Sequence, residues 1–568
     1  MSRLFDEHIK REVKSLSGIW QMQPDPENIG EIRGFMNGLP ESHTVSVPSV
    51  WNSELGMLTY EGVCWYEKIF HTEGGVLRFS FGAVMSDARV YLDGELIGSH
   101  YGGYCRFTLI KRDVKPGKHR LTVRVDNSFD DISIPQPLVD WYHYGGITRD
   151  IEVERLSGIA VLYSNIDYTL DQNNADVSFT VELYNAEDQR VTDELTISLD
   201  GKTISESKVT LDGGEMKTIK VTGGRVAKIE RWSAEHTRLY TLCTETSSDD
   251  LYDRVGFRHI EIRDRAVYLN GKKIRFRGIN RHEEHPEFGM AFPEVLMHRD
   301  IEIIKNMGVN SIRGSHYPNN PKFVDLLDEH GIFFWSEIPM WGGGFPREKL
   351  ADPRVIERGL LMHKEMIHEY YNHPSIIIWG MHNEIDTRSE EALNISKIYY
   401  EYLKKNGGNR LVTYATNKMN TDICFKYCDF IAFNSYVGWY EGGGFPSWEV
   451  YANAMEDYLI EQGVADKPVV TSEFGAAAIY GHHTFDNLKW TEEYQAKLIS
   501  DCIKLFFSRE EYAGSFVWQF ADIRTSEPMG LNRARSFNNK GVVNEYRRPK
   551  MAYGAIKTIY ESEREKEK

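Results

Sequence analysis

Short apolar segments alternate with amphipathic helical segments from about residue 264 to the end of the chain. Each apolar segment has the length of a buried strand, and the segments between them repeat apolar residues with helical periodicity. Eight β/α units in about 300 residues fit a closed TIM barrel better than an open, doubly wound sheet, and no GxGxxG motif follows any predicted strand. The predicted strands are 274–280, 309–315, 332–338, 375–381, 411–416, 430–435, 468–472 and 514–520, and helices are predicted between most of them, for example over 295–307, 353–371, 390–405, 448–462 and 491–507.

The first part of the chain, up to about residue 260, has a different pattern. Residues 76–81, 88–92 and 120–125 alternate apolar and polar side chains, as half-buried strands do. After a break near residues 154–158, further alternating runs follow, with Asp200-Gly201 as a hairpin signal. About a hundred residues with this spacing suit a small sandwich of immunoglobulin type. We therefore expect a β-rich domain over residues 1–157, an immunoglobulin-like β-sandwich over 158–263 and the barrel over 264–568.

Composition limits the partners that this chain is expected to bind. A net charge of −17 disfavours nucleic acids and anionic membranes. The six cysteines are scattered, which favours buried reduced thiols over zinc or redox use. The first residues are charged where a signal peptide needs an apolar core, and no apolar run approaches about 18 residues. These observations predict a cytoplasmic protein with neither a nucleic acid nor a membrane as partner.

Two glutamates follow apolar, strand-like segments. The segment 375–381 leads to Asn383-Glu384, and the segment 468–472 leads to Glu473. Burying an unpaired carboxylate costs several kcal/mol, so two in this position suggest a catalytic pair. The C-terminal ends of TIM-barrel strands meet at one face, which brings distant residues together. The same rim is predicted to carry His316, Tyr436, Tyr440 and Trp518.

A pair of carboxyl groups among aromatic side chains is what glycoside hydrolysis requires. One carboxyl group donates a proton to the leaving oxygen, while the other, ionised, attacks the anomeric carbon or orients water. Aromatic walls complement the apolar faces of a sugar ring. A separation of about 5 to 5.5 Å between the carboxyl groups would indicate retention and a wider gap inversion, and the sequence leaves both open. The alternative for either glutamate alone is a structural ion pair with an arginine or a lysine.

Several segments resemble glycoside hydrolase family 2: YEGVCWYE at 60–67, GINRHE at 278–283, SHYP at 315–318, WGMHNE at 379–384 and TSEFG at 471–475. The resemblance covers nearly the whole chain and implies that residues 1–157 form a jelly-roll-like, sugar-binding β-sandwich. It also implies that Glu384 is the general acid/base and Glu473 the nucleophile of a retaining mechanism. Asn383 matches the family position that holds the 2-hydroxyl of the sugar, a contact that strengthens in the transition state.

Residues after the eighth predicted strand carry the signal for the type of sugar. A uronic acid bears a carboxylate at C6, and its recognition needs a cation or a cluster of strong donors. Asn538 and Lys540 resemble the Asn-x-Lys motif of β-glucuronidases, which clamps this carboxylate. Arg533 or Arg535 is expected to add a second cation. The alternative is a solvated basic loop.

Two further matches favour the same group within the family. Residues 434–440 resemble the segment around the sixth strand of β-glucuronidases. Asp140 matches an acid of their N-terminal domain that reaches the sugar hydroxyls, although a structural role for this aspartate stays open. The resemblance therefore implies a retaining exo-β-glucuronidase that hydrolyses terminal β-D-glucuronides through a covalent glycosyl-enzyme intermediate.

Two other functions remain open at this point. A β-galactosidase of the same family has a neutral substrate, which would leave Lys540 without a task, and the remaining alternative is a non-catalytic carbohydrate-binding protein. No metal or other cofactor is expected, because residues 282–285 lack the HExxH spacing. A homo-oligomer, either dimer or tetramer, is expected.

The loops around the predicted site suggest an open entrance. No long insertion follows the third predicted strand, which favours bulky or oligosaccharide aglycones over small aryl conjugates. The sequence GGGFP occurs at 342–346 and again at 442–446. Both copies are predicted to form rim loops, with Phe345 or Phe445 as a candidate for stacking on a sugar.

Overall fold

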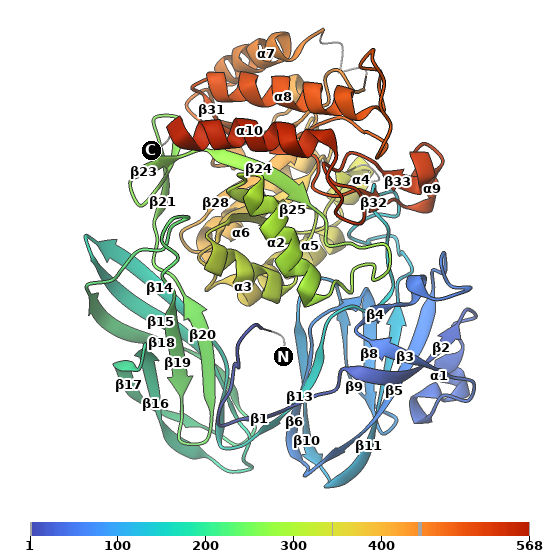
Figure 1. The fold of residues 1–568 in the computed structure, drawn as a ribbon. Helices are drawn as coiled ribbons and strands as arrows, with labels where there is room; N and C mark the ends of the chain where they lie inside the picture. The colour runs from blue at the N-terminus through green and yellow to red at the C-terminus, as the bar shows by residue number, and fades with distance from the viewer. Residues whose placement is uncertain (1–2, 343–344, 441–445, 567–568) are drawn as a thin grey trace.

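The computed structural model describes residues 3–342, 345–440 and 446–566. Two β-sandwiches lie beneath a helix-covered barrel (Figure 1), the first in blue at the lower right and the second in teal and green at the lower left. This arrangement confirms the predicted fold class of β-sandwiches followed by a TIM barrel. No helix within the described ranges is long and apolar enough to span a bilayer.

The N-terminal sandwich packs a four-stranded sheet against a six-stranded one. Alternation places the apolar residues of facing strands, such as Phe79 and Val123, in one shared core. The first sheet consists of β1 (Glu12–Ser15), β13 (Ile151–Leu156), β6 (Gly75–Phe81) and β10 (Phe107–Val114). The second consists of β3 (His43–Val47), β2 (Gly18–Asp25), β5 (Val63–Thr72), β11 (Gly117–Asp126), β8 (Asp87–Leu92) and β9 (Glu95–Tyr101), and a small sheet adds β4 (Ser49–Val50), β12 (Gly146–Ile147) and β7 (Val84–Met85).

The second sandwich follows the hairpin pattern read from the sequence. Asp200 and Gly201 have φ values of 48° and 74°, which suits the tight turn between β16 and β17. One sheet holds β14 (Ile159–Asp171), β15 (Asn174–Asn185) and β18 (Met216–Ala227), and the other holds β17 (Lys202–Leu211), β16 (Val191–Leu199), β19 (Tyr240–Glu245) and β20 (Asp250–Val255). A small sheet of β21 (Ile260–Arg263), β22 (Ala266–Leu269) and β23 (Lys272–Ile274) leads into the barrel.

Eight parallel strands close the barrel, each overlapping one predicted segment: β24 (Phe276–Arg281), β25 (Ser311–Gly314), β26 (Phe333–Glu337), β27 (Ile376–Asn383), β28 (Leu411–Thr416), β29 (Ile431–Asn434), β30 (Val469–Phe474) and β31 (Tyr512–Val517). The covering helices include α2 (Glu294–Asn306), α3 (Pro321–His330), α5 (Pro353–Tyr370), α6 (Glu390–Asn406), α7 (Trp448–Glu461), α8 (Glu492–Ser508) and α10 (Met551–Lys566). Trp518, predicted inside the eighth strand, follows β31: its N–H makes the last hydrogen bond to β30, at 2.9 Å to the carbonyl of Phe474, and the next N–H, that of Gln519, turns to the carbonyl of Lys540 at 3.0 Å.

The N-terminal sandwich is fixed to the mouth of the barrel by buried polar contacts. Arg149 pairs with Glu283 at 3.2 Å, and the Tyr144 hydroxyl donates to Glu284 at 2.9 Å. Both glutamates follow β24 directly, so the segment that carries Asp140 is held over the strand ends. The division of the chain at 157/158 and 263/264 remains a prediction.

Candidate active site

A cavity of about 500 Å³ opens where the C-terminal ends of the barrel strands meet. Its walls come from loops that follow several of the strands and from Asp140 and Trp141 of the N-terminal sandwich. The volume lies in the range of pockets that hold drug-sized ligands. The predicted site residues that line it are Asp140, His316, Glu384, Tyr436, Tyr440, Glu473, Trp518, Arg533 and Lys540.

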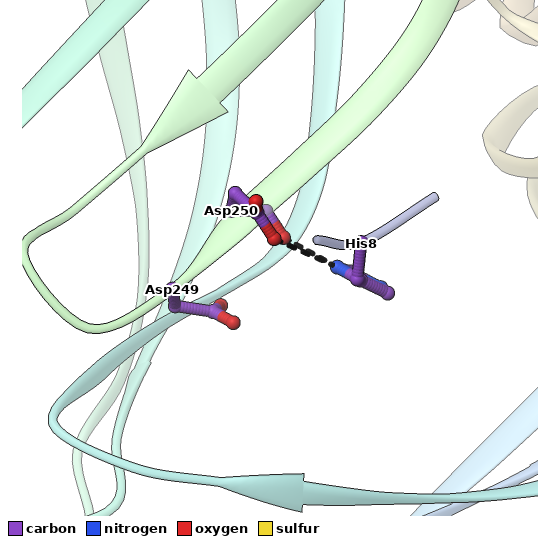
Figure 2. A group of neighbouring side chains, drawn as sticks. All are labelled: His8, Asp249 and Asp250. Atoms are coloured by element: carbon purple, nitrogen blue, oxygen red, sulfur yellow. Dashed lines mark hydrogen bonds and ion pairs between the residues drawn. The ribbon is translucent and has the colours of Figure 1, made fainter. Parts of the chain in front are cut away.

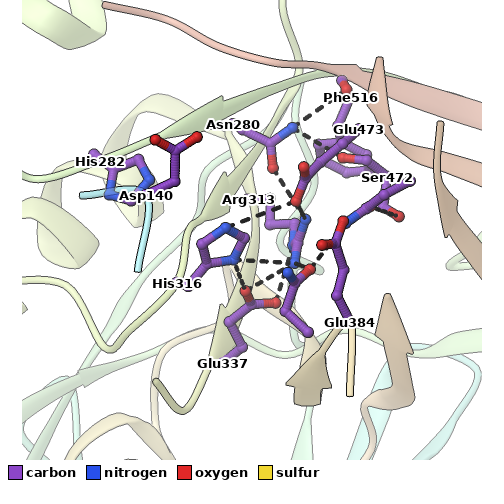
Figure 3. A network of polar contacts seen from close by, with 12 residues as sticks. Asp140, Asn280, His282, Arg313, His316, Glu337, Glu384, Ser472, Glu473 and Phe516 are labelled. Carbon is purple, nitrogen blue, oxygen red and sulfur yellow. Dashed lines mark hydrogen bonds and ion pairs between the residues drawn. The ribbon is translucent and has the colours of Figure 1, made fainter. Parts of the chain in front are cut away.

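Arg313 of β25 organises the floor of this cavity (Figure 3). Its guanidinium donates to Glu473 at 2.8 Å and to both carboxylate oxygens of Glu337 at 2.9 Å each. The Tyr436 hydroxyl donates to the other oxygen of Glu473 at 2.7 Å. The Arg313 and Glu337 side chains are fully buried, and burial strengthens charge-assisted hydrogen bonds of this kind. Two donors therefore hold the Glu473 carboxyl group in one orientation.

Glu384 follows β27 in a strained backbone conformation. Its φ is 56°, in the left-handed region that costs a residue with a side chain roughly 1–2 kcal/mol. The main-chain N–H donates to the carbonyl of Ala415 at 2.8 Å, and the side-chain amide of Asn434 donates to the Glu384 carboxyl group at 2.7 Å. Ser472 orients that amide by donating to its oxygen at 2.7 Å. Neighbouring strands thus hold Glu384 in a conformation typical of functional sites.

The two carboxyl groups share one electrostatic environment. Burial raises the pKa of Glu473 to about 8, with Arg313 opposing the shift and Glu384 adding to it. Burial also raises the pKa of Glu384, against the hydrogen bond from Asn434. Two buried carboxyl groups that repel each other titrate as a pair. The pair therefore keeps one proton at neutral pH, and the guanidinium of Arg313 favours the negative charge on Glu473.

A second corner of the cavity is positively charged. The Lys540 ammonium and the Arg533 guanidinium each donate to the Tyr440 hydroxyl at 2.9 Å. Burial acts to raise the pKa of this hydroxyl, but the two cations outweigh it and lower that pKa. Arg533 has Asp140 as its counter-charge. Lys540 is 2% exposed and has no carboxylate within ion-pair distance among the described residues.

Two more predicted residues lie next to these groups. Asn538 does not line the cavity; its amide donates to Asp140 at 2.9 Å. Asn383 does not line the cavity either, and its oxygen accepts from Arg313 at 2.7 Å and from Asn434 at 3.0 Å. The amide nitrogen of Asn383 and one oxygen of Asp140 have no hydrogen-bond partner in the described ranges. Each of these two buried atoms therefore has a hydrogen bond still to make.

Sequence reasoning missed the residues that orient the pair. Arg313 and Glu337 lie inside predicted apolar strands, and Asn434 ends another. Arg313 and Glu337 could have been found by the signal that identified the two glutamates. A charged side chain inside a buried strand requires a partner. Which charges pair with which is decided only by strand order around the barrel.

The structure also separates candidates that the sequence left together. Arg533 lines the cavity, whereas Arg535 turns away and pairs with Glu545 at 2.8 Å. Phe345 was a candidate for stacking on a sugar, and this prediction is wrong, because its side chain is 6% exposed and packs in the barrel core. Phe445 lies outside the described residues.

Two groups of carboxylate and imidazole side chains in the described ranges lie close enough to hold a metal ion, and both are explained by hydrogen bonds. The first is His8, Asp249 and Asp250 (Figure 2). The imidazole of His8 donates to the Asp250 carbonyl and accepts from Arg11. Asp250 accepts from the main-chain N–H groups of residues 9 and 10, and Asp249 pairs with Arg11. These contacts fasten the N-terminal segment to the second sandwich.

The second group consists of Asp325, Asp328 and His373. The guanidinium of Arg3 donates to both oxygens of Asp325 at 2.7 to 3.0 Å. Asp328 accepts from His373 at 2.5 Å and from the main-chain N–H of Ser375 at 2.9 Å. The guanidinium of Arg3 already neutralises Asp325, and both oxygens of Asp328 already accept hydrogen bonds. These two carboxylates therefore do not suit a metal cation. All six cysteines lie in the described ranges, and each is a buried free thiol.

Comparison with known proteins identifies the family to which this chain is similar. The model described as "Glycosyl hydrolases family 2, TIM barrel domain" matches residues 260–563, and the model described as "Glycosyl hydrolases family 2" matches residues 162–258. A family 2 β-galacturonidase from Eisenbergiella tayi, solved with bound galacturonate, superposes with a TM-score of 0.92 at 33% identity and 99% coverage of both chains.

Two further relatives are β-glucuronidases. The Ruminococcus gnavus enzyme superposes with a TM-score of 0.86 at 27% identity, covering 98% of this chain and 99% of that one. The Paenibacillus borealis enzyme is 27% identical over 96% of both chains. With these matches and the paired carboxyl groups at the barrel mouth, the chain belongs to glycoside hydrolase family 2 and is a glycoside hydrolase.

Proposed function

We propose that this enzyme is a retaining exo-β-uronidase whose substrate is a terminal β-D-glucuronide. One observation carries the proposal: the Lys540 ammonium is almost fully buried at the cavity wall and has no carboxylate partner in the described part of the chain. A buried charge is costly unless it is paired. A carboxylate at C6 of the sugar would supply that partner, whereas a neutral hexose would leave the charge uncompensated.

The site residues support a double displacement. Glu473, oriented by Arg313 and Tyr436, attacks the anomeric carbon while Glu384 donates its proton to the glycosidic oxygen, and the aglycone leaves as an alcohol. Glu384, now ionised, removes a proton from water, which attacks the same carbon, releases the sugar and restores the Glu473 carboxylate. We assign the contact with the 2-hydroxyl in both transition states to the amide nitrogen of Asn383, which has no hydrogen-bond partner in the described ranges.

Retention can be tested by following the first product. Proton NMR spectra recorded during the first minutes of hydrolysis are expected to show the β-anomer of the free uronic acid before mutarotation sets in. Early appearance of the α-anomer would mean that the enzyme inverts, and the role of Glu473 as nucleophile would then be wrong.

The pH profile follows from the shared proton. The reactive pair holds one proton and one charge, and burial raises the pKa of Glu384, the proposed acid, above its ordinary value. A raised pKa keeps the proton on the acid at neutral pH and lets it go as the medium becomes alkaline, so kcat/KM is expected to fall on the alkaline side of neutrality. In Glu384→Ala, with a dinitrophenyl leaving group that needs no proton, this alkaline decline should disappear. An unchanged decline would mean that another group titrates.

A panel of four aryl glycosides tests the sugar: β-D-glucuronide, β-D-galacturonide, β-D-glucoside and β-D-galactoside with one common aryl group. We expect the glucuronide to have the highest kcat/KM. The galacturonide is the second candidate, because the relative solved with bound galacturonate has the higher identity and TM-score of the two solved structures compared above. Preference for the galactoside would revive the galactosidase alternative, and no turnover of any compound would favour a binding protein.

The expected homo-oligomer, dimer or tetramer, is likewise a proposal. Sedimentation equilibrium of the full chain gives its mass directly, and a particle of 65.6 kDa would be a monomer. Cytoplasmic location is proposed with it, in line with six free, buried thiols.

A further inference from the structure

We infer that the aglycone side of the cavity is a second anion-recognition site, built around Lys418, which selects uronides whose aglycone carries a carboxylate or a sulfo group. This inference rests on the proposed uronidase function, since it concerns the group on the other side of the scissile bond. It assigns Lys418 and Arg388 as specificity residues for the leaving group.

Lys418 is a half-buried cation next to the proposed acid. It follows β28, lines the cavity, and its charge acts on Glu384 by lowering the pKa of that carboxyl group. Within the described ranges the Lys418 ammonium makes no ion pair and no hydrogen bond. Glu384 must be protonated to act as the acid, so in the reactive state this neighbour offers Lys418 no negative charge. An anionic group on the aglycone would supply the missing partner.

Arg388 extends the positive charge along the same wall. It lines the cavity on the loop after β27 and donates to Asp386 at 2.6 Å. The same carboxylate accepts from Arg347 of α4 (Arg347–Leu350) at 2.7 Å. Two guanidinium groups thus share one carboxylate, which leaves an excess positive charge beside that of Lys418.

The position of these cations relative to the first anion site follows from barrel topology. Lys540 and Arg533 lie on the segment after β31, and β27 and β28 are the strands diametrically across the closed barrel from β31 and β24. The loop after β27 is joined to the end of β28 by a hydrogen bond between the Thr387 and Thr416 hydroxyls at 3.1 Å. The carboxyl pair therefore lies between two positively charged walls, one for the sugar and one for the leaving group.

The lining of the second wall is otherwise mostly polar. Asn417, Asn420 and Thr421 flank Lys418, Met419 adds one apolar side chain, and Glu384 is the one carboxyl group that the loops after β27 and β28 contribute to the described cavity lining. Neutral donors and acceptors of this kind suit the hydroxyl groups of a second sugar. An acidic saccharide fits this wall better than an apolar aryl group does.

The test compares aglycones that differ in charge. Three substrates share the glycone that the panel identifies and carry 4-carboxyphenyl, 4-sulfophenyl or 4-carbamoylphenyl as leaving group. We take the ratio of kcat/KM for each anionic compound to that for the carbamoyl compound, and compare the ratio between variants. Intrinsic differences in leaving-group reactivity cancel in this comparison, as in a double-mutant cycle.

Lys418→Met is expected to lower the carboxyl-to-carbamoyl ratio about fivefold, the size expected for a half-exposed ion pair, and Lys418→Glu to lower it further. A response of the 4-sulfophenyl ratio alone would assign the site to sulfated aglycones. The control is Lys202→Met, an exposed lysine of the second sandwich that removes the same charge far from the cavity, and it should leave both ratios unchanged.

Salt provides a readout on the unmodified enzyme. Raising ionic strength from about 0.05 M to about 0.5 M should reduce both ratios, because screening weakens a half-exposed ion pair. Ratios that respond neither to salt nor to Lys418→Glu would overturn the inference while leaving the proposed uronidase function intact. Failure of that function would appear separately, as absence of uronide turnover in the panel.

Discussion

Glu473→Gln is expected to lower kcat by at least about 10⁴-fold, the scale seen when a catalytic nucleophile is removed. The amide cannot attack the anomeric carbon, so the covalent step is lost. The fold should survive, because Glu337 keeps its two hydrogen bonds to Arg313 at 2.9 Å. Single-turnover rates with an activated aryl uronide, together with a thermal unfolding curve, separate loss of chemistry from loss of structure.

Azide distinguishes the roles of the two glutamates. In Glu473→Ala, azide can enter the vacated space and attack from the face that the carboxylate used, which gives the α-glycosyl azide. In Glu384→Ala, the covalent intermediate still forms from an activated substrate, and azide attacks it from the opposite face to give the β-glycosyl azide. If both variants gave the same anomer, the assignment of nucleophile and acid would be wrong.

Lys540→Met is expected to lower kcat/KM for an aryl glucuronide by about 10²-fold or more. The substitution preserves most of the side-chain volume but leaves the substrate carboxylate desolvated without its partner. The slow hydrolysis of the matching aryl glucoside should change little or improve, because that sugar has no carboxylate. The ratio of the two kcat/KM values is therefore the measurement.

The chain offers a matched control on the same segment. Arg535 is also cationic but pairs with Glu545 at 2.8 Å and does not line the cavity. Arg535→Met should alter the glucuronide-to-glucoside ratio less than about threefold, within the range of a surface ion pair. If Arg535→Met reduced the ratio as much as Lys540→Met, the loop conformation rather than the Lys540 charge would explain the effect, and the uronide proposal would lose its main support.

The strand positions of the barrel were readable from local pattern. Buried parallel strands are continuous apolar segments bounded by helical periodicity. Strands β27 and β30 begin one residue later than their predicted segments and run two residues beyond them, so that Glu384 follows β27 and Glu473 lies in β30. The predicted segment of the eighth strand ran past Val517, where β31 ends, since the N–H of Gln519 no longer bonds to β30 but to the carbonyl of Lys540, which is distant in the sequence. Such a contact leaves no trace in the local pattern.

The site was readable only in part. Single residues such as Lys540 in a loop and Glu473 after an apolar segment could be recognised from the sequence. Their partners could not, because Arg313 contacts Glu473 across 160 residues and Asn434 contacts Glu384 across 50. The direction of a loop side chain was equally hidden, as Arg533 and Arg535 show.

Local sequence features were sufficient to predict the barrel, the position of two carboxyl groups at its mouth and the presence of a cation after the last strand, because periodicity and residue chemistry are local properties. Tertiary structure alone decided that Arg313 holds Glu473, that Arg533 and not Arg535 faces the cavity, and that Lys418 lies beside Glu384. The physical reason is that the closing of eight strands sets distances between residues far apart in the chain, and electrostatic interactions depend on those distances.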